Sequence, residues 1–219
     1  MIIHGFFILA LVCSISLALQ DDISSESKKA EQLYIKLFKR QRAEQLDAIK
    51  NFQKVSNGKH ERKSMLQLMS EKIFQVIQKS RASIESSPFI PGISEFPLDR
   101  DIQDLLSNIL ENTALFSEIV LRFPDIAASL LKSNNEWNIT LQWSIAFCNQ
   151  MKYLLDSSTI KLLSLASQEL NYIPRDPDFL NPYRKDKKPQ VTLGDLKSVK
   201  KKKKKIVKKG PRLSTHVEL

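Results

Sequence analysis

Histidine, cysteine and paired carboxylates build most catalytic and metal sites, and this chain of 219 residues is poor in them. It contains 3 histidines and 2 cysteines, without the spacing of a zinc site or of a nucleophile with its base. His60 lies in a charged run that predicts a solvated helix start, and Cys148 lies in an apolar run that favours burial. We therefore expect no catalytic residue, no bound metal and no cofactor.

One modification motif is present. Asn138-Ile139-Thr140 has the spacing of an N-glycosylation acceptor, which would place an N-linked glycan on Asn138. The motif lies beside Trp137 at the start of a predicted helix. Two outcomes stay open for Asn138: the side chain faces solvent and is modified, or it folds away before modification.

A lysine run dominates the charge of the chain. Residues 197–219 carry ten Lys or Arg against one acidic residue, although the formal net charge of the whole chain is only +10. Such a run neutralises phosphates without sequence preference, and it lacks interleaved aromatic residues and any groove-reading motif. We interpret it as a solvated tail and expect no nucleic-acid partner. A nuclear, nucleic-acid-associated role of this run is a second alternative function.

The first 18 residues have the pattern of a secretory signal peptide. No Lys, Arg, Asp or Glu occurs in the first 19 residues, and small residues, including Ser16, precede a cleavage site after Ala18. The alternative is an uncleaved membrane anchor, because about 18 apolar residues are just long enough to span a bilayer. After cleavage we expect no transmembrane segment.

The last four residues resemble a retrieval signal. The chain ends His216-Val217-Glu218-Leu219, similar to the K-D-E-L/H-D-E-L sequences that return proteins to the endoplasmic reticulum. Together with the leader, this ending predicts the lumen of the endoplasmic reticulum and recognition by a KDEL-type retrieval receptor. Val217 stands where Asp is usual, so partial secretion is expected.

Apolar residues at three- and four-residue spacing predict helices through the middle of the chain. We expect an all-α fold, in which a single helical-bundle-like domain of about five or six helices covers 26–173. A short flexible start at 19–25 precedes it, and a Pro-containing, Lys-rich disordered tail follows at 174–219. Asp99 is expected to cap the third helix, Ser157 and Ser158 the sixth. The expected helices are 26–55, 60–84, 99–123, 124–132, 136–155 and 159–172.

Candidate partner contacts lie where the helices break or carry large aromatic groups. A loop at 86–97 contains three prolines and several apolar residues, so it should pack onto the helices. The two tryptophans are six residues apart and thus lie on different sides of a helix; an exposed one would be a partner anchor, and burial of both is the alternative. The candidates are Arg122, Phe123, Pro124, Trp137 and Trp143, with the loop 89–96.

Several strings carry a resemblance through their order and spacing. They are Glu111-Asn112-Thr113-Ala114, Val120-Leu121-Arg122-Phe123-Pro124, Phe147-Cys148-Asn149-Gln150, Ala166-Ser167-Gln168-Glu169-Leu170 and Lys209-Gly210-Pro211-Arg212. Together they resemble the family of coiled-coil domain-containing protein 134 over nearly the whole mature chain. A sequon that is frequent in the family at the position of Asn149 is absent here, because Met151 replaces its hydroxyl residue.

The resemblance implies a lumenal, all-helical protein without catalysis. It implies an adaptor that associates with nascent endoplasmin, the lumenal heat-shock chaperone, at the translocon. There it would limit excess N-glycosylation of endoplasmin by the oligosaccharyltransferase. The same resemblance implies an alternative, a secreted cytokine-like helical protein that modulates mitogen-activated kinase signalling.

Overall fold

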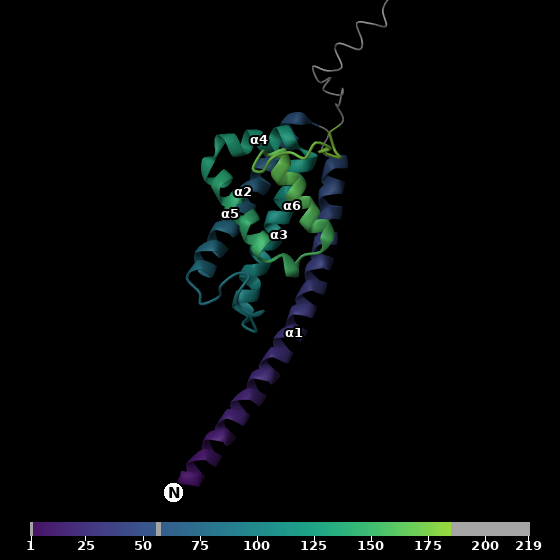
Figure 1. Ribbon diagram of the computed structural model, residues 1–219. Helices are drawn as coiled ribbons and strands as arrows, with labels where there is room; N and C mark the ends of the chain where they lie inside the picture. The colour runs from purple at the N-terminus through teal and green to yellow at the C-terminus, as the bar shows by residue number, and fades with distance from the viewer. Residues whose placement is uncertain (1, 56–57, 185–219) are drawn as a thin grey trace, which may run out of the picture. The chain divides into compact units, whose positions relative to one another are not determined.

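The computed structural model describes residues 2–55 and 58–184, with the side chains of residues 24–54 and 58–184. Within these ranges the chain contains six α-helices, one 3₁₀ turn and no strand, so the predicted all-α fold is confirmed. Figure 1 shows their arrangement. The elements are α1 (Ile2–Val55), α2 (Lys59–Glu85), α3 (Arg100–Arg122), α4 (Pro124–Ser133), α5 (Asn135–Gln150), η1 (Lys152–Leu154) and α6 (Ser157–Glu169).

Helix α3 is the central element, because its second half is apolar on nearly every side and must be covered on every side. It packs against α1, α2, α4, α5 and α6 (Figure 1). Its small polar residues are satisfied along the helix itself. The Thr113 hydroxyl donates to the carbonyl of Ile109 at 2.6 Å, and the Ser117 hydroxyl donates to the carbonyl of Thr113 at 2.8 Å. The buried hydroxyls of Thr113 and Ser117 therefore need no water.

Local sequence signals set most helix ends as predicted. The carboxylate of Asp99 accepts from the backbone N–H of Asp101 at 2.8 Å, which caps α3. Helix α3 ends at Arg122, and Pro124 begins α4, because a proline disfavours helical backbone in the residue before it but suits a first turn. Asn134 caps α5 by accepting from the backbone N–H of Trp137 at 3.2 Å.

Two predicted ends in the last third of the domain are wrong. Helix α5 ends at Gln150 and not at 155, because the chain turns there and buries Met151 and Leu154 fully. Helix α6 is capped by Asp156 and not by the serines that follow it. The Asp156 carboxylate accepts from the backbone N–H groups of Ser158 and Thr159, at 3.1 and 3.3 Å.

Helix α6 ends in a tight turn that fixes the next residues. Asn171 has a φ of 58°, the left-handed conformation that closes many helices. Its N–H donates to the carbonyl of Gln168 at 3.2 Å, and the N–H of Tyr172 donates to the carbonyl of Ser167 at 2.9 Å. These two bonds form a Schellman motif, so the position of Tyr172 is set by the end of α6.

We expect the end of α6 to be sensitive to the shape of residue 171. Asn171→Gly should keep or slightly raise the free energy of unfolding, whereas Asn171→Val should lower it by about 1–2 kcal/mol, because a β-branched residue is strained at positive φ. Urea unfolding of both variants, followed by circular dichroism at 222 nm, measures the difference. Equal stability of the glycine and valine variants would contradict the left-handed turn.

The domain differs from its predicted limits at both ends. Helix α1 is continuous through 19–25, where the sequence predicted a flexible start. After α6 the chain stays attached through Tyr183, beyond the predicted boundary at 173. Asn181 is 1% exposed, and its amide donates to the carbonyl of Leu121 at 3.0 Å. The prolines indicated a tail, but these polar contacts hold 174–183 on the bundle.

The apolar interior consists of two clusters. One is built around Phe74 and Phe116, the other around Phe38, Leu106 and Cys148. Helix α1 contributes a narrow apolar stripe, since Leu33 and Leu37 remain 57% and 55% exposed. The inward stripe of α1 is Tyr34, Phe38, Ile49 and the partly buried Phe52.

Candidate functional site

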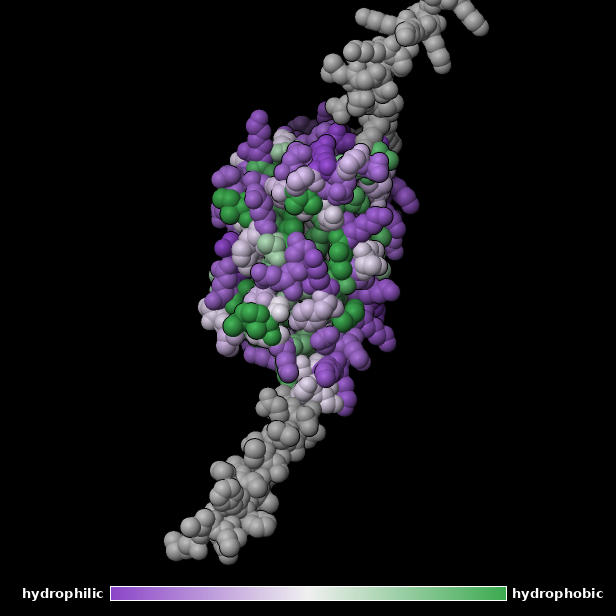
Figure 2. Space-filling view, in the orientation of Figure 1, coloured by the Kyte–Doolittle hydropathy of each residue, from purple (hydrophilic) through white to green (hydrophobic). Residues whose placement is uncertain are grey.

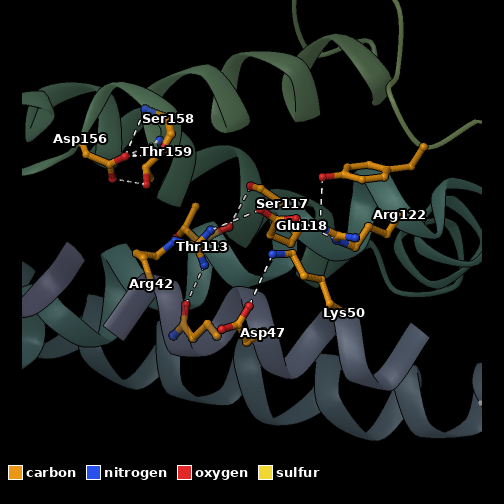
Figure 3. A network of polar contacts seen from close by, with 12 residues as sticks. Arg42, Asp47, Lys50, Thr113, Ser117, Glu118, Arg122, Asp156, Ser158 and Thr159 are labelled. Carbon is orange, nitrogen blue, oxygen red and sulfur yellow. Dashed lines mark hydrogen bonds and ion pairs between the residues drawn. The ribbon is translucent and has the colours of Figure 1, made fainter. Parts of the chain in front are cut away.

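Three charged side chains meet in the interior between α1 and α3 (Figure 3). One carboxylate oxygen of Glu118 accepts from Nε of Arg122 at 3.0 Å, and the other lies 3.5 Å from Nη2 of Arg42. The three side chains are between 5% and 9% exposed. We call Arg42, Glu118 and Arg122 the ion cluster.

Neutral partners extend the ion cluster to the chain that follows α6. Arg122 donates from Nη1 to Oε1 of Gln53 and from Nη2 to the hydroxyl of Tyr183, both at 3.0 Å. Its guanidinium also stacks over the Tyr183 ring, 4.2 Å from the ring centroid. Arg42 donates from Nη1 to Oε1 of Gln45 at 2.7 Å. The ion cluster therefore ties together α1, α3 and the segment 174–183.

The ion cluster has two positive charges for one negative charge. Burial lowers the pKa of Arg42, while Glu118, Asp156 and Glu111 act in the opposite direction. Nε of Arg42 is buried and has no hydrogen-bond partner within residues 24–54 and 58–184. Because arginine stays protonated in proteins, the two guanidinium groups remain charged and act as a fixed ionic contact with Glu118.

Arg122 and Phe123, two of the predicted partner contacts, are used inside the fold. Arg122 belongs to the ion cluster, and Phe123 is 7% exposed. The ring of Phe123 meets Phe52 edge to face, with centroids 5.8 Å apart. The break before Pro124 turns these residues inward, so their burial corrects the expectation of a partner contact there. Pro124 itself is half-buried at the start of α4.

Both tryptophans are half-buried against neighbouring helices. Trp137 stacks on Phe74 with ring centroids 5.1 Å apart and an interplanar angle of 19°. The guanidinium of Arg81 lies over the ring of Trp143, with Cζ 4.7 Å from the ring centroid. The Trp143 ring also contacts Phe147. Each indole therefore has a packing role and is only partly exposed to a partner.

Asn138 and Thr140, the two ends of the sequon, also make contacts across the bundle. Asn138 is half-buried, and its Oδ1 accepts from the hydroxyl of Tyr172. Thr140 is 4% exposed, and Nε2 of Gln78 donates to its hydroxyl at 3.4 Å.

The segment 86–99 between α2 and α3 contains a rigid apolar loop at 87–98. Two aromatic side chains hold it on the bundle, since Phe89 and Phe96 are 9% and 3% exposed. The hydroxyl of Ser27 on α1 donates to the carbonyl of Phe96 at 2.7 Å. As predicted, the loop packs onto the helices.

The tip of the apolar loop points apolar side chains outward. Ile90 and Ile93 are 54% and 81% exposed. Ser94 fixes the tip, because its hydroxyl accepts from the N–H of Ile90 at 2.9 Å and its N–H donates to the carbonyl of Ile90 at 2.9 Å. Gly92 has a φ of 77°, and a Cβ there would lie 3.2 Å from the carbonyl oxygen of Gln150. Figure 2 shows hydrophobic side chains at several separate places on the visible face, one of them at its lower left.

Other reactive groups and hollows give no chemical site within the described residues. No group of three or more His, Cys, Asp or Glu there could hold a metal ion. His60 is exposed in the first turn of α2. Burial raises the pKa of the Cys148 thiol to about 12, which leaves it unreactive, as its apolar surroundings predicted. A groove of ≈ 740 Å³ between α2 and α3 is lined by both lysines and aspartates.

The family model described as "ERK and JNK pathways, inhibitor" matches residues 19–214 of the chain. The chain belongs to this family. It is similar to coiled-coil domain-containing protein 134 of Mus musculus, with 36% identity over 155 residues, which are 71% of this chain and 67% of the mouse protein. The protein of the same name from Xenopus tropicalis is 34% identical over 180 residues, 82% of this chain and 77% of the frog protein.

These relatives confirm the resemblance that the sequence strings indicated. No solved structure matches the chain. Among helices of the described part, none is both long and apolar enough to cross a bilayer. The described residues do not include the side chains of the expected leader, the lysine run or the last four residues, His216, Val217, Glu218 and Leu219. Cleavage after Ala18 and retrieval therefore stay predictions.

Sequence reasoning missed the ion cluster, although one signal for it was present. Glu118 and Arg122 stand four residues apart in a stretch of α3 that is apolar all round. A charged pair in such a stretch indicates a buried ion pair, because no solvent-facing side remains for it. Arg42 gave no such signal, since the surrounding part of α1 is rich in charged residues.

Proposed function

We propose that this chain is a non-enzymatic adaptor of the endoplasmic reticulum lumen, of which a fraction is secreted. The apolar leader and the terminal His216-Val217-Glu218-Leu219 support this address. The family match begins at residue 19, next to the expected cleavage site after Ala18. The names of the two relatives describe a coiled-coil protein and no enzyme.

The observation that carries the adaptor role is the apolar loop. An apolar tip on a fixed backbone loses little conformational freedom on binding, so more of its contact energy remains as affinity. Ile90 and Ile93 form such a tip. The favoured partner is nascent endoplasmin at the translocon, where the loop would hold an apolar stretch and sterically hinder the oligosaccharyltransferase from glycosylating it.

A charge on the loop tip tests this role. In cells that lack the protein, we expect endoplasmin to carry extra N-glycans, and the intact chain should restore the normal glycoform. Ile90→Asp with Ile93→Asp should fail to restore it, because the apolar contact is lost while the exposed tip leaves the fold unchanged. The measurement is the gel mobility of endoplasmin before and after endoglycosidase treatment.

The matched control is Leu180→Asp, which changes another exposed apolar residue, 57% exposed, outside the loop. It should restore the glycoform like the intact chain. If the double loop variant restores the normal glycoform, the loop is not needed for the effect. If endoplasmin carries no extra N-glycans in cells that lack the protein, the proposed adaptor role is wrong.

A second candidate function follows from the family description, which names inhibition of the ERK and JNK pathways. Under this candidate the secreted fraction modulates mitogen-activated kinase signalling from outside the cell. Purified chain added to cultured cells would then lower phosphorylation of both kinases. Deleting the last four residues distinguishes the two proposed functions. Secretion of the chain should rise, which would strengthen its effect on kinase signalling and weaken its effect on endoplasmin glycosylation.

A further inference from the structure

The sequon at Asn138 occupies an unsuitable conformation for modification in the folded domain. It lies within α5, where residues two apart point to different sides of the helix. An enzyme that requires both the asparagine and the hydroxyl two residues later must reach both at once. In extended chain these two side chains lie on the same face, so the acceptor sequence suits a transferase only when it is not helical.

Tertiary contacts hold the Asn138 end of the sequon. The Tyr172 hydroxyl donates to Oδ1 of Asn138, and the Schellman motif at Asn171 fixes Tyr172 against the end of α6. Burial raises the pKa of Tyr172 to about 12, so its hydroxyl keeps the proton it donates at neutral pH. Modification of Asn138 in place would require α5 and the turn at Asn171 and Tyr172 to separate locally.

The Thr140 end is held from a different helix. Thr140 is 4% exposed, and Gln78 of α2 donates to its hydroxyl and, at 2.8 Å, to the carboxylate of Glu136. The middle residue, Ile139, is 54% exposed, so the most exposed position of the sequon is the one that carries no recognition. Both recognised side chains are thus turned into contacts between α5 and its neighbours.

We propose that Asn138 accepts an N-linked glycan only before α5 has packed against α2 and the turn that follows α6, so that its occupancy is set by competition between folding and glycan transfer. The inference rests on the proposed entry into the endoplasmic reticulum. Under this proposal, the rate of folding determines the fraction of chains that carry the glycan. Asn138-Ile139-Thr140 is the one such sequon in the sequence, so occupancy reports on this site alone.

The transfer itself is compatible with the final fold. Nδ2 of Asn138 forms a bond to the anomeric carbon of an oligosaccharide, and the bond from that carbon to a lipid pyrophosphate breaks. The lipid pyrophosphate leaves with the electron pair, and one amide proton passes to a base of the transferase. Oδ1 takes no part, so it can still accept from Tyr172 once the glycosylated chain folds.

The first experiment uses purified components. The full chain, produced without glycan, is incubated with purified oligosaccharyltransferase and a lipid-pyrophosphate oligosaccharide, and intact mass measures transfer. Phe116→Asp supplies the same sequon in an unfolded chain, because Phe116 is fully buried in α3. We expect the folded chain to be modified at least about tenfold more slowly than Phe116→Asp, since only its locally opened fraction can react. Asn138→Gln should show no transfer.

The second experiment measures occupancy in secreting cells. Tyr172→Phe removes only the hydroxyl that holds Asn138, and Tyr153→Phe is the matched control on an exposed tyrosine, 42% exposed. We expect the unoccupied fraction to fall by about twofold or more for Tyr172→Phe and to stay unchanged for Tyr153→Phe, because the local opening becomes easier.

The outcomes separate the inference from the proposed function. Equal transfer rates for the folded chain and Phe116→Asp, or no transfer to Phe116→Asp, overturn the inference whatever the address of the protein. Slow transfer to the folded chain in the purified system, with no glycan on Phe116→Asp in cells, supports the folding restriction and counts against entry into the lumen. Unchanged occupancy for Tyr172→Phe in cells also overturns the proposed role of the Tyr172 contact.

Discussion

Replacing Glu118 by alanine is expected to lower the free energy of unfolding by about 3–5 kcal/mol, because it leaves buried positive charge without its counter-charge. Glu118 contacts both Arg42 and Arg122 within 3.5 Å, and all three side chains are at most 9% exposed. Urea unfolding of the intact chain and the variant, followed by circular dichroism, measures the loss.

Glu44→Ala is the matched control. Glu44 pairs with Arg40 at 3.1 Å, but the two side chains are 58% and 79% exposed. Its removal should cost no more than about 0.5 kcal/mol, because an exposed pair on one helix is screened by water. A Glu118→Ala variant as stable as Glu44→Ala would show that the ion cluster is hydrated and contributes little.

Replacing all three residues of the ion cluster tests whether the cluster stabilises the fold or whether its charges only need to remain paired. Changing Arg42, Glu118 and Arg122 together to methionine should cost less than Glu118→Ala alone, because no buried charge is then left unpaired. The ion cluster would in that case serve to fix which elements meet. Its contacts with Gln53 and Tyr183 place the end of α1 and the segment 174–183 on the same side of α3.

Helix limits could be predicted where one side chain decides the backbone. Asp99 and Pro124 act through their own capping bond and ring, so the sequence placed both ends of α3 well. The end of α5 failed because the burial of Met151 and Leu154 against other helices decides it. The exposed Leu33 and Leu37 show the same limit: periodicity finds an apolar face but not how much of it is covered.

The apolar loop and the sequon could be predicted from local sequence, but the contacts that hold the sequon could not. The apolar loop follows from prolines and apolar residues that stand close together in the sequence. The bond from Tyr172 to Asn138 and the bond from Gln78 to Thr140 join residues 34 and 62 positions apart, and no local pattern indicates either. The sequence thus identified the acceptor, while the contacts that restrict it depend on tertiary packing.

Phe74→Ala is expected to lower the free energy of unfolding by about 3–5 kcal/mol, because it removes a fully buried ring from a packed core. The Phe74 ring lies against Phe116 and Trp137, with centroids 4.7 and 5.1 Å away. The variant is measured by urea unfolding in a Trp143→Phe background, so that Trp137 alone reports by fluorescence. The control Tyr153→Ala, on a 42% exposed side chain, should change stability by about 0.5 kcal/mol or less.

Urea unfolding followed by circular dichroism decides what Trp137 does, because Trp137→Ala in the Trp143→Phe background leaves no tryptophan to report by fluorescence. Since Trp137 stacks on Phe74, Trp137→Ala should also destabilise the domain, and its effect should not add to that of Phe74→Ala, because both changes remove one shared contact. A partner anchor would behave differently: Trp137→Ala would leave the free energy of unfolding unchanged and abolish binding of the partner. The stacking geometry therefore predicts that Trp137 stabilises the packing of α5 beside the sequon, and that the apolar loop is left as the surface for a partner.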